Sequence, residues 1–81
     1  MITIILYTTA GCHLCDLADV ILQELTNNHD LKINHTEIGD DDDLVASYGT
    51  TIPVVRFIDN SEILWPFSRQ DIERKIEQLQ A

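Results

Sequence analysis

The residues best suited to chemistry in this sequence are Cys12 and Cys15, which are separated by two residues. Thiols at this spacing can form a reversible disulfide, or they can bind a metal ion. Two cysteines are too few to build a scaffold held together by disulfides. The elements on either side of the pair therefore decide between redox chemistry and metal chemistry.

The segment before the cysteines has the pattern of a strand, and the segment after them that of a helix. Residues 2–7 are a short apolar run typical of a buried strand, and residues 8–11 form a turn-like break. After the cysteines the apolar residues recur with a helical period, which predicts an amphipathic helix over residues 13–27. Cys12 then lies at the helix N-terminus, where outward-pointing amides carry partial positive charge.

This placement predicts different roles for the two thiols. A helix N-terminus lowers the pKa of a thiol below the free value of ~8.5, and only the thiolate attacks a disulfide. Cys12 is therefore the predicted nucleophile, and Cys15, one helical turn further on, is the predicted resolving thiol. Protonated His13 would favour the neighbouring thiolate, whereas the carboxylate of Asp16 would disfavour it. The alternative for the pair is two small, buried hydrophobic side chains.

The rest of the sequence predicts three more strands and two more helices. In chain order they are a strand at residues 31–38, a short helix at 41–48, strands at 54–58 and 62–65, and a final helix after Ser68. The aspartates at 40–43 can cap the first of these helices, and Ser68 with Asp71 resembles a capping box for the second. The order β-α-β-α-β-β-α predicts an α/β fold: a four-stranded mixed sheet with helices on both faces.

Composition and charge exclude several classes of protein. The chain has 81 residues, 44% of them hydrophobic, so we expect residues 1–81 to form a single domain. No apolar run reaches the ~18–20 residues of a membrane span, and the apolar start is too short for a secretory signal, which predicts a cytoplasmic protein. The net charge of −9 disfavours nucleic acid and anionic membranes as partners.

Two segments resemble glutaredoxins of the thioredoxin-like superfamily. They are residues 6–15 (LYTTAGCHLC) and residues 51–54 (TIPV), and the order of elements matches over nearly the whole chain. The C-H-L-C form is similar to a short glutaredoxin-like branch rather than to the common C-P-Y-C enzymes. The resemblance implies a cis peptide bond before Pro53, beside the cysteines, and a backbone at Ile52 that pairs with a bound peptide or glutathione. His13, Thr51, Ile52 and Pro53 are accordingly the predicted substrate-binding residues.

Three features that help typical glutaredoxins to hold glutathione are replaced in this chain. A lysine shortly before the first cysteine is replaced by Thr8 and Thr9. A Gly-Gly pair in the hairpin is replaced by residues 60–61, and an acidic pair at the last helix by residues 67–69. The resemblance therefore implies thiol chemistry more strongly than it implies glutathione binding.

Metal binding is the competing chemistry for the same cysteines. Together with His29 and His35 they fit the loose spacing of a zinc finger. The predicted helix would, however, place His29 ~20 Å from the cysteines, because a helix rises 1.5 Å per residue. Zinc ligands lie within ~2.0–2.3 Å of the metal, so both histidines are expected to be surface polar residues. An iron–sulfur role, seen in some glutaredoxins, relies on glutathione and dimerisation.

We therefore predict a monomeric thiol–disulfide oxidoreductase that reduces protein disulfides or glutathione mixed disulfides. Its partners are a disulfide-containing protein or glutathione, glutathione is a candidate reductant, and no cofactor is expected to be tightly bound. The alternatives are a non-catalytic thioredoxin-fold module that docks an extended peptide beside Ile52 and Pro53, and a metal or iron–sulfur protein that uses Cys12 and Cys15.

Overall fold

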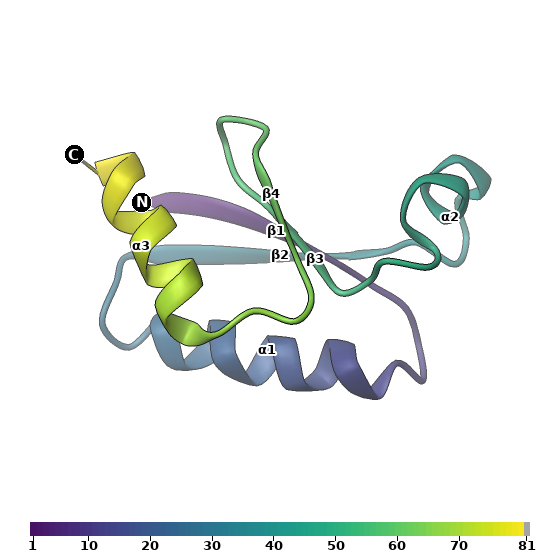
Figure 1. Ribbon diagram of the computed structural model, residues 1–81, viewed down its shortest axis with the longest axis horizontal. Coiled ribbons are helices and arrows are strands. Elements are labelled where there is room, and N and C mark those ends of the chain that lie inside the picture. The colour runs from purple at the N-terminus through teal and green to yellow at the C-terminus, as the bar shows by residue number, and fades with distance from the viewer. Residues whose placement is uncertain (81) are drawn as a thin grey trace.

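The structure, a computed structural model, describes residues 1–80 (Figure 1). Its elements in chain order are β1 (Ile2–Thr8), α1 (His13–Leu25), β2 (Leu31–Glu37), α2 (Asp42–Tyr48), β3 (Val54–Arg56), β4 (Glu62–Leu64) and α3 (Arg69–Gln80). The predicted order β-α-β-α-β-β-α is confirmed. No helix among residues 1–80 is long and apolar enough to cross a membrane.

The strands form one mixed sheet in the order β2-β1-β3-β4. β1 runs parallel to β2, with Ile2 opposite Leu31, because the helix between them carries the chain back to the same end of the sheet. β3 runs antiparallel to β1, with Val54 opposite Tyr7, and forms the predicted antiparallel hairpin with β4. The chain therefore leaves β1, leaves β2 and enters β3 at one edge of the sheet.

One face of the sheet is covered by α1 and α3, which pack together with it into the main core (Figure 1). Alternate residues of β1, Ile4 and Leu6, point into this core, as the period of a strand requires. The helices contribute buried residues at spacings of three and four: Ala18, Leu22 and Leu25 from α1, and Ile72 and Ile76 from α3. Burial of these faces fixes both helices against the sheet.

The other face of the sheet is only partly covered, by α2 at one end (Figure 1). A smaller cluster forms there around Tyr7, Ile38 and Val54, and Leu44 and Tyr48 of α2 pack against it. Away from α2 this face stays open, and Leu64 is 51% exposed. Helices thus lie on both faces, as predicted, but they cover them unequally.

Side chains cap the helices at the positions that the sequence predicts for α2 and α3. The carboxylate of Asp41 accepts hydrogen bonds from the backbone N–H groups of Asp43 (3.0 Å) and Leu44 (3.2 Å). At α3 the capping box is reciprocal. The Ser68 N–H donates to Asp71 Oδ2 (2.9 Å), and the Asp71 N–H donates to Ser68 Oγ (3.2 Å).

Some elements end earlier than the sequence predicts. α1 ends at Leu25 rather than at residue 27. The next residues close a tighter turn, in which the N–H groups of Asn27 and Asn28 donate to carbonyl oxygens three residues back. β3 ends at Arg56 rather than at residue 58. Its turn closes around Asn60, whose positive φ of 69° an asparagine tolerates well. β2 and β4 also each end one residue early.

We expect Leu22→Ala to lower the free energy of unfolding by about 2–5 kcal/mol, because Leu22 is fully buried between α1 and the sheet. The matched control in the same helix is Leu17→Ala, which removes a side chain that is 42% exposed and is expected to cost less than about 1 kcal/mol. Urea denaturation followed by circular dichroism measures both. Equal losses for the two variants would contradict this packing of α1.

Candidate functional site

Cys12 and Cys15 are joined by a disulfide at the N-terminus of α1. Their Cα atoms are 5.2 Å apart, within the usual range for a disulfide. Cys12 is the N-cap residue and has an extended backbone, and its Sγ accepts a hydrogen bond from the Cys15 N–H at 3.1 Å. The sulfur of Cys12 therefore lies where the unpaired amides of the helix end point.

The two cysteines differ in exposure. Cys15 is 1% exposed, whereas Cys12 is only half-buried. An incoming disulfide can thus reach Cys12, while Cys15 lies beneath it against the core. His13, the first residue of α1, is exposed to solvent next to the pair.

The loop that delivers the chain to Cys12 is held by a carboxylate from the end of β2. Glu37 Oε1 accepts hydrogen bonds from the Ala10 N–H (2.9 Å) and from the Thr9 hydroxyl (3.3 Å), and Oε2 accepts one from the Gly39 N–H (3.2 Å). The N–H groups of Ala10 and then Gly39 lower the pKa of the Glu37 carboxyl below its ordinary value. Glu37 is not among the residues that the sequence predicts for the site. The sequence does offer one signal for Glu37. It is the last residue of β2, and because β2 is parallel to β1, its end lies beside the end of β1 that leads to Cys12.

The predicted substrate-binding segment lies in the loop that enters β3. The Ile52–Pro53 peptide bond is cis, Pro53 is buried, Ile52 is half-buried and Thr51 is exposed. The N–H groups of Thr51 (2.9 Å) and Ile52 (3.0 Å) both donate to the carbonyl oxygen of Tyr48. Because β3 pairs with β1, this loop reaches the same edge of the sheet as Cys12. The topology thus brings these residues to the cysteine end of the molecule.

Tyr48 anchors α2, and with it the start of that loop. Its ring stacks on Tyr7 of β1, with ring centroids 4.3 Å apart. Its phenol donates a hydrogen bond to the carboxylate of Glu62 on β4. This hydrogen bond, together with burial and the charge of Glu62, raises the pKa of Tyr48 to about 12.

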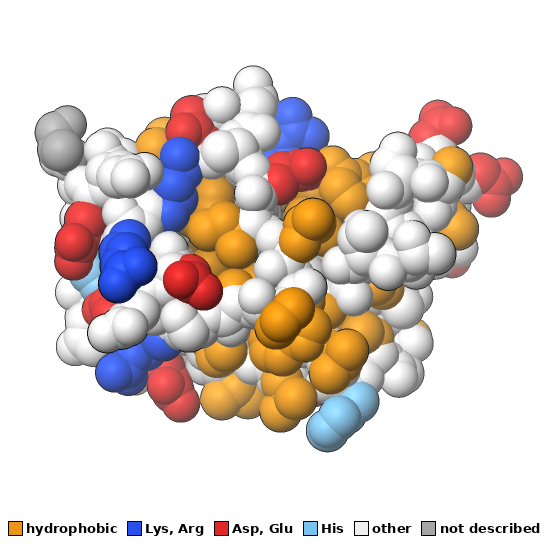
Figure 2. All heavy atoms as spheres, viewed as in Figure 1, with side chains coloured by type: hydrophobic (Ala, Val, Ile, Leu, Met, Phe, Trp, Pro, Cys, Tyr) orange, Lys and Arg blue, Asp and Glu red, His pale blue; other side chains and the backbone are white. Residues whose placement is uncertain are grey.

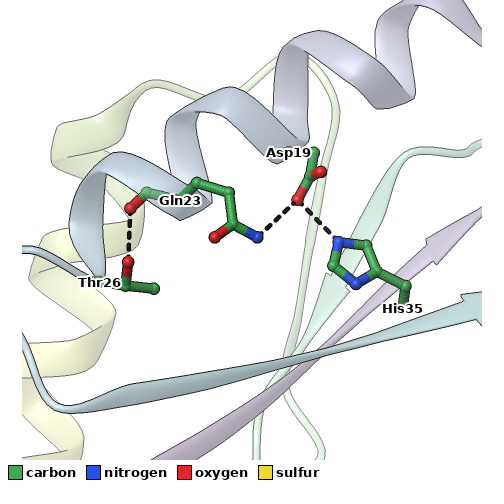
Figure 3. Close-up of polar contacts among 4 residues, drawn as sticks. All are labelled: Asp19, Gln23, Thr26 and His35. Atoms are coloured by element: carbon green, nitrogen blue, oxygen red, sulfur yellow. Dashed lines mark hydrogen bonds and ion pairs between the residues drawn. The ribbon is translucent and has the colours of Figure 1, made fainter.

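The two histidines of the zinc hypothesis are engaged elsewhere. His35 of β2 points toward α1, where its Nε2 lies 2.8 Å from Asp19 Oδ1, and Gln23 donates to the same oxygen (Figure 3). His29 is half-buried, and its Nε2 lies 3.2 Å from Glu73 Oε2 of α3. The prediction of a surface position is confirmed for His35, which is exposed, whereas only part of the His29 side chain lies at the surface. Within residues 1–80, no three His, Cys, Asp or Glu side chains are placed to hold a metal ion.

The surface beside the cysteines is apolar. Leu14 and Leu17 of α1 are 46% and 42% exposed. Figure 2 shows hydrophobic side chains gathered over the N-terminal half of α1 and the segment between β4 and α3. A hollow of about 490 Å³ lies farther along α1, lined by residues between Asp19 and Asn27, and contains neither cysteine. The disulfide therefore borders an open surface and lies outside that hollow.

Comparison with known proteins identifies the family and the fold. The family model described as Glutaredoxin-like domain (DUF836) matches residues 3–77. The X-ray structure of target protein XcR50 from X. campestris superposes with a TM-score of 0.82 at 29% identity, over 93% of this chain and 96% of that chain. No curated protein matches the chain.

Two thioredoxins share the fold at lower identity. Oxidised thioredoxin O2 from Arabidopsis thaliana has a TM-score of 0.71 at 20% identity, over 98% of this chain and 75% of that chain. Thioredoxin 1 from Thermosipho africanus has a TM-score of 0.68 at 20% identity, over 98% and 99% of the two chains. The predicted thioredoxin-like fold is therefore confirmed.

The phenol of Tyr48 is expected to titrate with a pKa of about 12 instead of its ordinary value of 10.0. Because the folded pKa lies above the unfolded one, the contribution of this hydrogen bond to stability is present at neutral pH and is lost as the pH rises through about 12. The absorbance of tyrosinate, measured on the native protein and on Tyr48→Phe, gives the titration of Tyr48 by difference. A difference curve with its midpoint near 10 would contradict the contact with Glu62.

Proposed function

The chain belongs to the glutaredoxin-like domain family, and on this premise we propose that it is a thiol–disulfide oxidoreductase. The observation that supports this proposal most directly is the position of Cys12 and Cys15. They form a disulfide at the N-terminus of α1, with one sulfur reachable from solvent and the other buried. A structural disulfide needs no such difference in exposure, whereas an exchange reaction needs one sulfur that a substrate can reach.

In the proposed reaction the reduced protein transfers two electrons to a substrate disulfide. The Cys12 thiolate attacks one substrate sulfur, a mixed disulfide forms, and the other substrate sulfur leaves as a thiolate that takes up a proton. Cys15 then loses its proton and attacks the sulfur of Cys12, which releases the second substrate thiol. The products are two substrate thiols and the Cys12–Cys15 disulfide. Two molecules of glutathione, oxidised to glutathione disulfide, or one molecule of a dithiol then reduce this disulfide and return the protein to its starting state.

The position of Cys12 at the N-terminus of α1 supports its role as nucleophile. The Cys15 N–H already points at the Cys12 sulfur, so a negative charge formed there meets a donor without rearrangement. Once Cys12 is bonded to a substrate, Cys15 lies next to it in the first turn of the helix. Its burial keeps it from reacting first with external disulfides.

The loop before β3 supplies the proposed substrate contacts. Because the Ile52 N–H already donates to Tyr48, Ile52 offers its backbone carbonyl oxygen to an extended substrate chain. Pro53 shapes the loop beside the cysteines, and Thr51 and His13 border the site as exposed side chains. The exposed Leu14 and Leu17 favour a protein disulfide as substrate, because they offer apolar area that a folded or partly folded partner can cover. We propose that residues 1–81 act as one monomeric domain in the cytoplasm, without a tightly bound cofactor.

Two serine variants test this function. Cys12→Ser is expected to lower the rate of disulfide reduction to the uncatalysed level, because the attacking thiolate is gone. Cys15→Ser is expected to leave the first attack intact and to accumulate a mixed disulfide at Cys12, since the resolving thiol is missing. Intact mass after incubation with an oxidised peptide, followed by peptide mapping, measures both.

The serine variants also separate an enzyme from a non-catalytic binding module. A module that only docks a peptide beside Ile52 would bind it equally well in the native protein and in Cys12→Ser, and Cys15→Ser would accumulate no adduct. That combination of results would overturn the oxidoreductase proposal.

A further inference from the structure

Glu37 joins two segments of the chain that meet at the cysteine end of the sheet. Its Oε1 binds the backbone of Ala10 at 2.9 Å and the hydroxyl of Thr9 at 3.3 Å, and its Oε2 binds the backbone of Gly39 at 3.2 Å. One carboxylate thus ties the loop before α1 to the turn after β2. Thr9 and Gly39 pack closely as well, since a Cβ on Gly39 would lie 3.2 Å from Thr9 Oγ1.

The loop between β1 and Cys12 has few other restraints. Gly11 adopts a positive φ of 78°, and a Cβ built there would meet no atom within 4 Å. Ala10 and Gly11 are exposed, and inside the loop the Cys12 N–H donates to the Thr9 carbonyl oxygen at a long 3.3 Å. The disulfide supplies a further restraint in the oxidised protein, and that restraint is lost when Cys12 becomes the attacking thiolate.

We propose that Glu37 is a positioning residue for disulfide exchange: its carboxylate holds residues 9–11 so that the reduced Cys12 sulfur stays at the N-terminus of α1. This role rests on the oxidoreductase function proposed above. The attacking sulfur must approach a substrate disulfide in line with the bond that breaks, and small displacements of a reacting atom cost large factors in rate. A loosely held loop would spread the sulfur over many orientations, of which few are productive.

The charge of Glu37 has a second effect, which must be measured separately. A carboxylate near Cys12 opposes formation of the thiolate, so removing it is expected to lower the pKa of the Cys12 thiol. In the sequence, Asp16 and Asp40 are the other carboxylate residues close to this loop and to the turn after β2, and His13 follows Cys12 directly. Hydrogen bonds from the loop lower the pKa of Glu37 itself. At neutral pH its side chain is therefore a carboxylate that can accept these bonds.

The experiment compares the reduced protein with its variants Glu37→Gln and Glu37→Ala. The second-order rate constant for reaction with dithiodipyridine, a neutral disulfide, is measured from about pH 5 to about pH 10, which brackets the pKa of a thiol. Each profile yields the pKa of Cys12 and the plateau rate of its thiolate. The matched control is Asp59→Asn, because Asp59 binds the Ser61 N–H at 3.0 Å in the hairpin turn, away from the cysteines.

We expect the plateau rate to fall about tenfold in Glu37→Ala and by a smaller factor in Glu37→Gln, whose amide oxygen can still accept one of the two backbone bonds. The plateau in Asp59→Asn should match that of the native protein. A thiolate also becomes less nucleophilic as its pKa falls, but a decrease of about half a pKa unit lowers the plateau rate constant by less than about twofold. A tenfold loss would therefore report a change in the position of the sulfur. If Glu37→Ala does not fold, Glu37→Gln carries the test.

Two results would overturn the positioning role. One is a lower Cys12 pKa with an unchanged plateau, which would show that Glu37 acts through its charge alone. The other is a lower melting temperature with unchanged pKa and plateau, which would show a purely structural role. Failure of the oxidoreductase function looks different, because the native protein itself would then show no reaction that depends on Cys12.

Discussion

The burial of one face of α1 against the sheet is the constraint on which the rest of the site depends. Ala18, Leu22 and Leu25 are fully buried, so the helix can neither rotate nor slide without exposing them. That burial sets the direction in which the helix N-terminus points. The disulfide then follows from the first turn, because Cys12 caps the helix and Cys15 enters the core.

Strand order brings the other parts of the site to the same place. Because β2 runs parallel and β3 antiparallel to β1, which lies between them, the loops that leave β1 and β2 and the loop that enters β3 share one edge of the sheet. Two polar contacts then hold these loops in place. Glu37 ties the loop before Cys12 to the end of β2, and Tyr48 ties α2 and the approach to Pro53 to the sheet. Apolar packing thus positions α1, and hydrogen bonds hold the loops around its N-terminus in place.

The local pattern of the sequence predicts the elements and the position of the cysteines, because both depend on neighbours within a few residues. The helical period after Cys12 places α1, and the capping box at Ser68 places the start of α3. Contacts between segments that are far apart in the sequence cannot be predicted from such local patterns. Glu37 meets Ala10 across 27 residues, and only the register of β2 against β1 makes that contact visible. The partly buried position of His29 likewise depends on how α3 packs beside α1.

The most direct test of this account is a redox titration of the metal-free protein. The protein is equilibrated with a series of ratios of reduced to oxidised glutathione, the thiols are trapped by alkylation, and the species are separated by intact mass. The account predicts a single two-electron transition between the dithiol and the Cys12–Cys15 disulfide, with a midpoint between about −180 and −300 mV. If both thiols stay reduced across the whole series, the pair is not redox-active in this range, and the proposed function is contradicted.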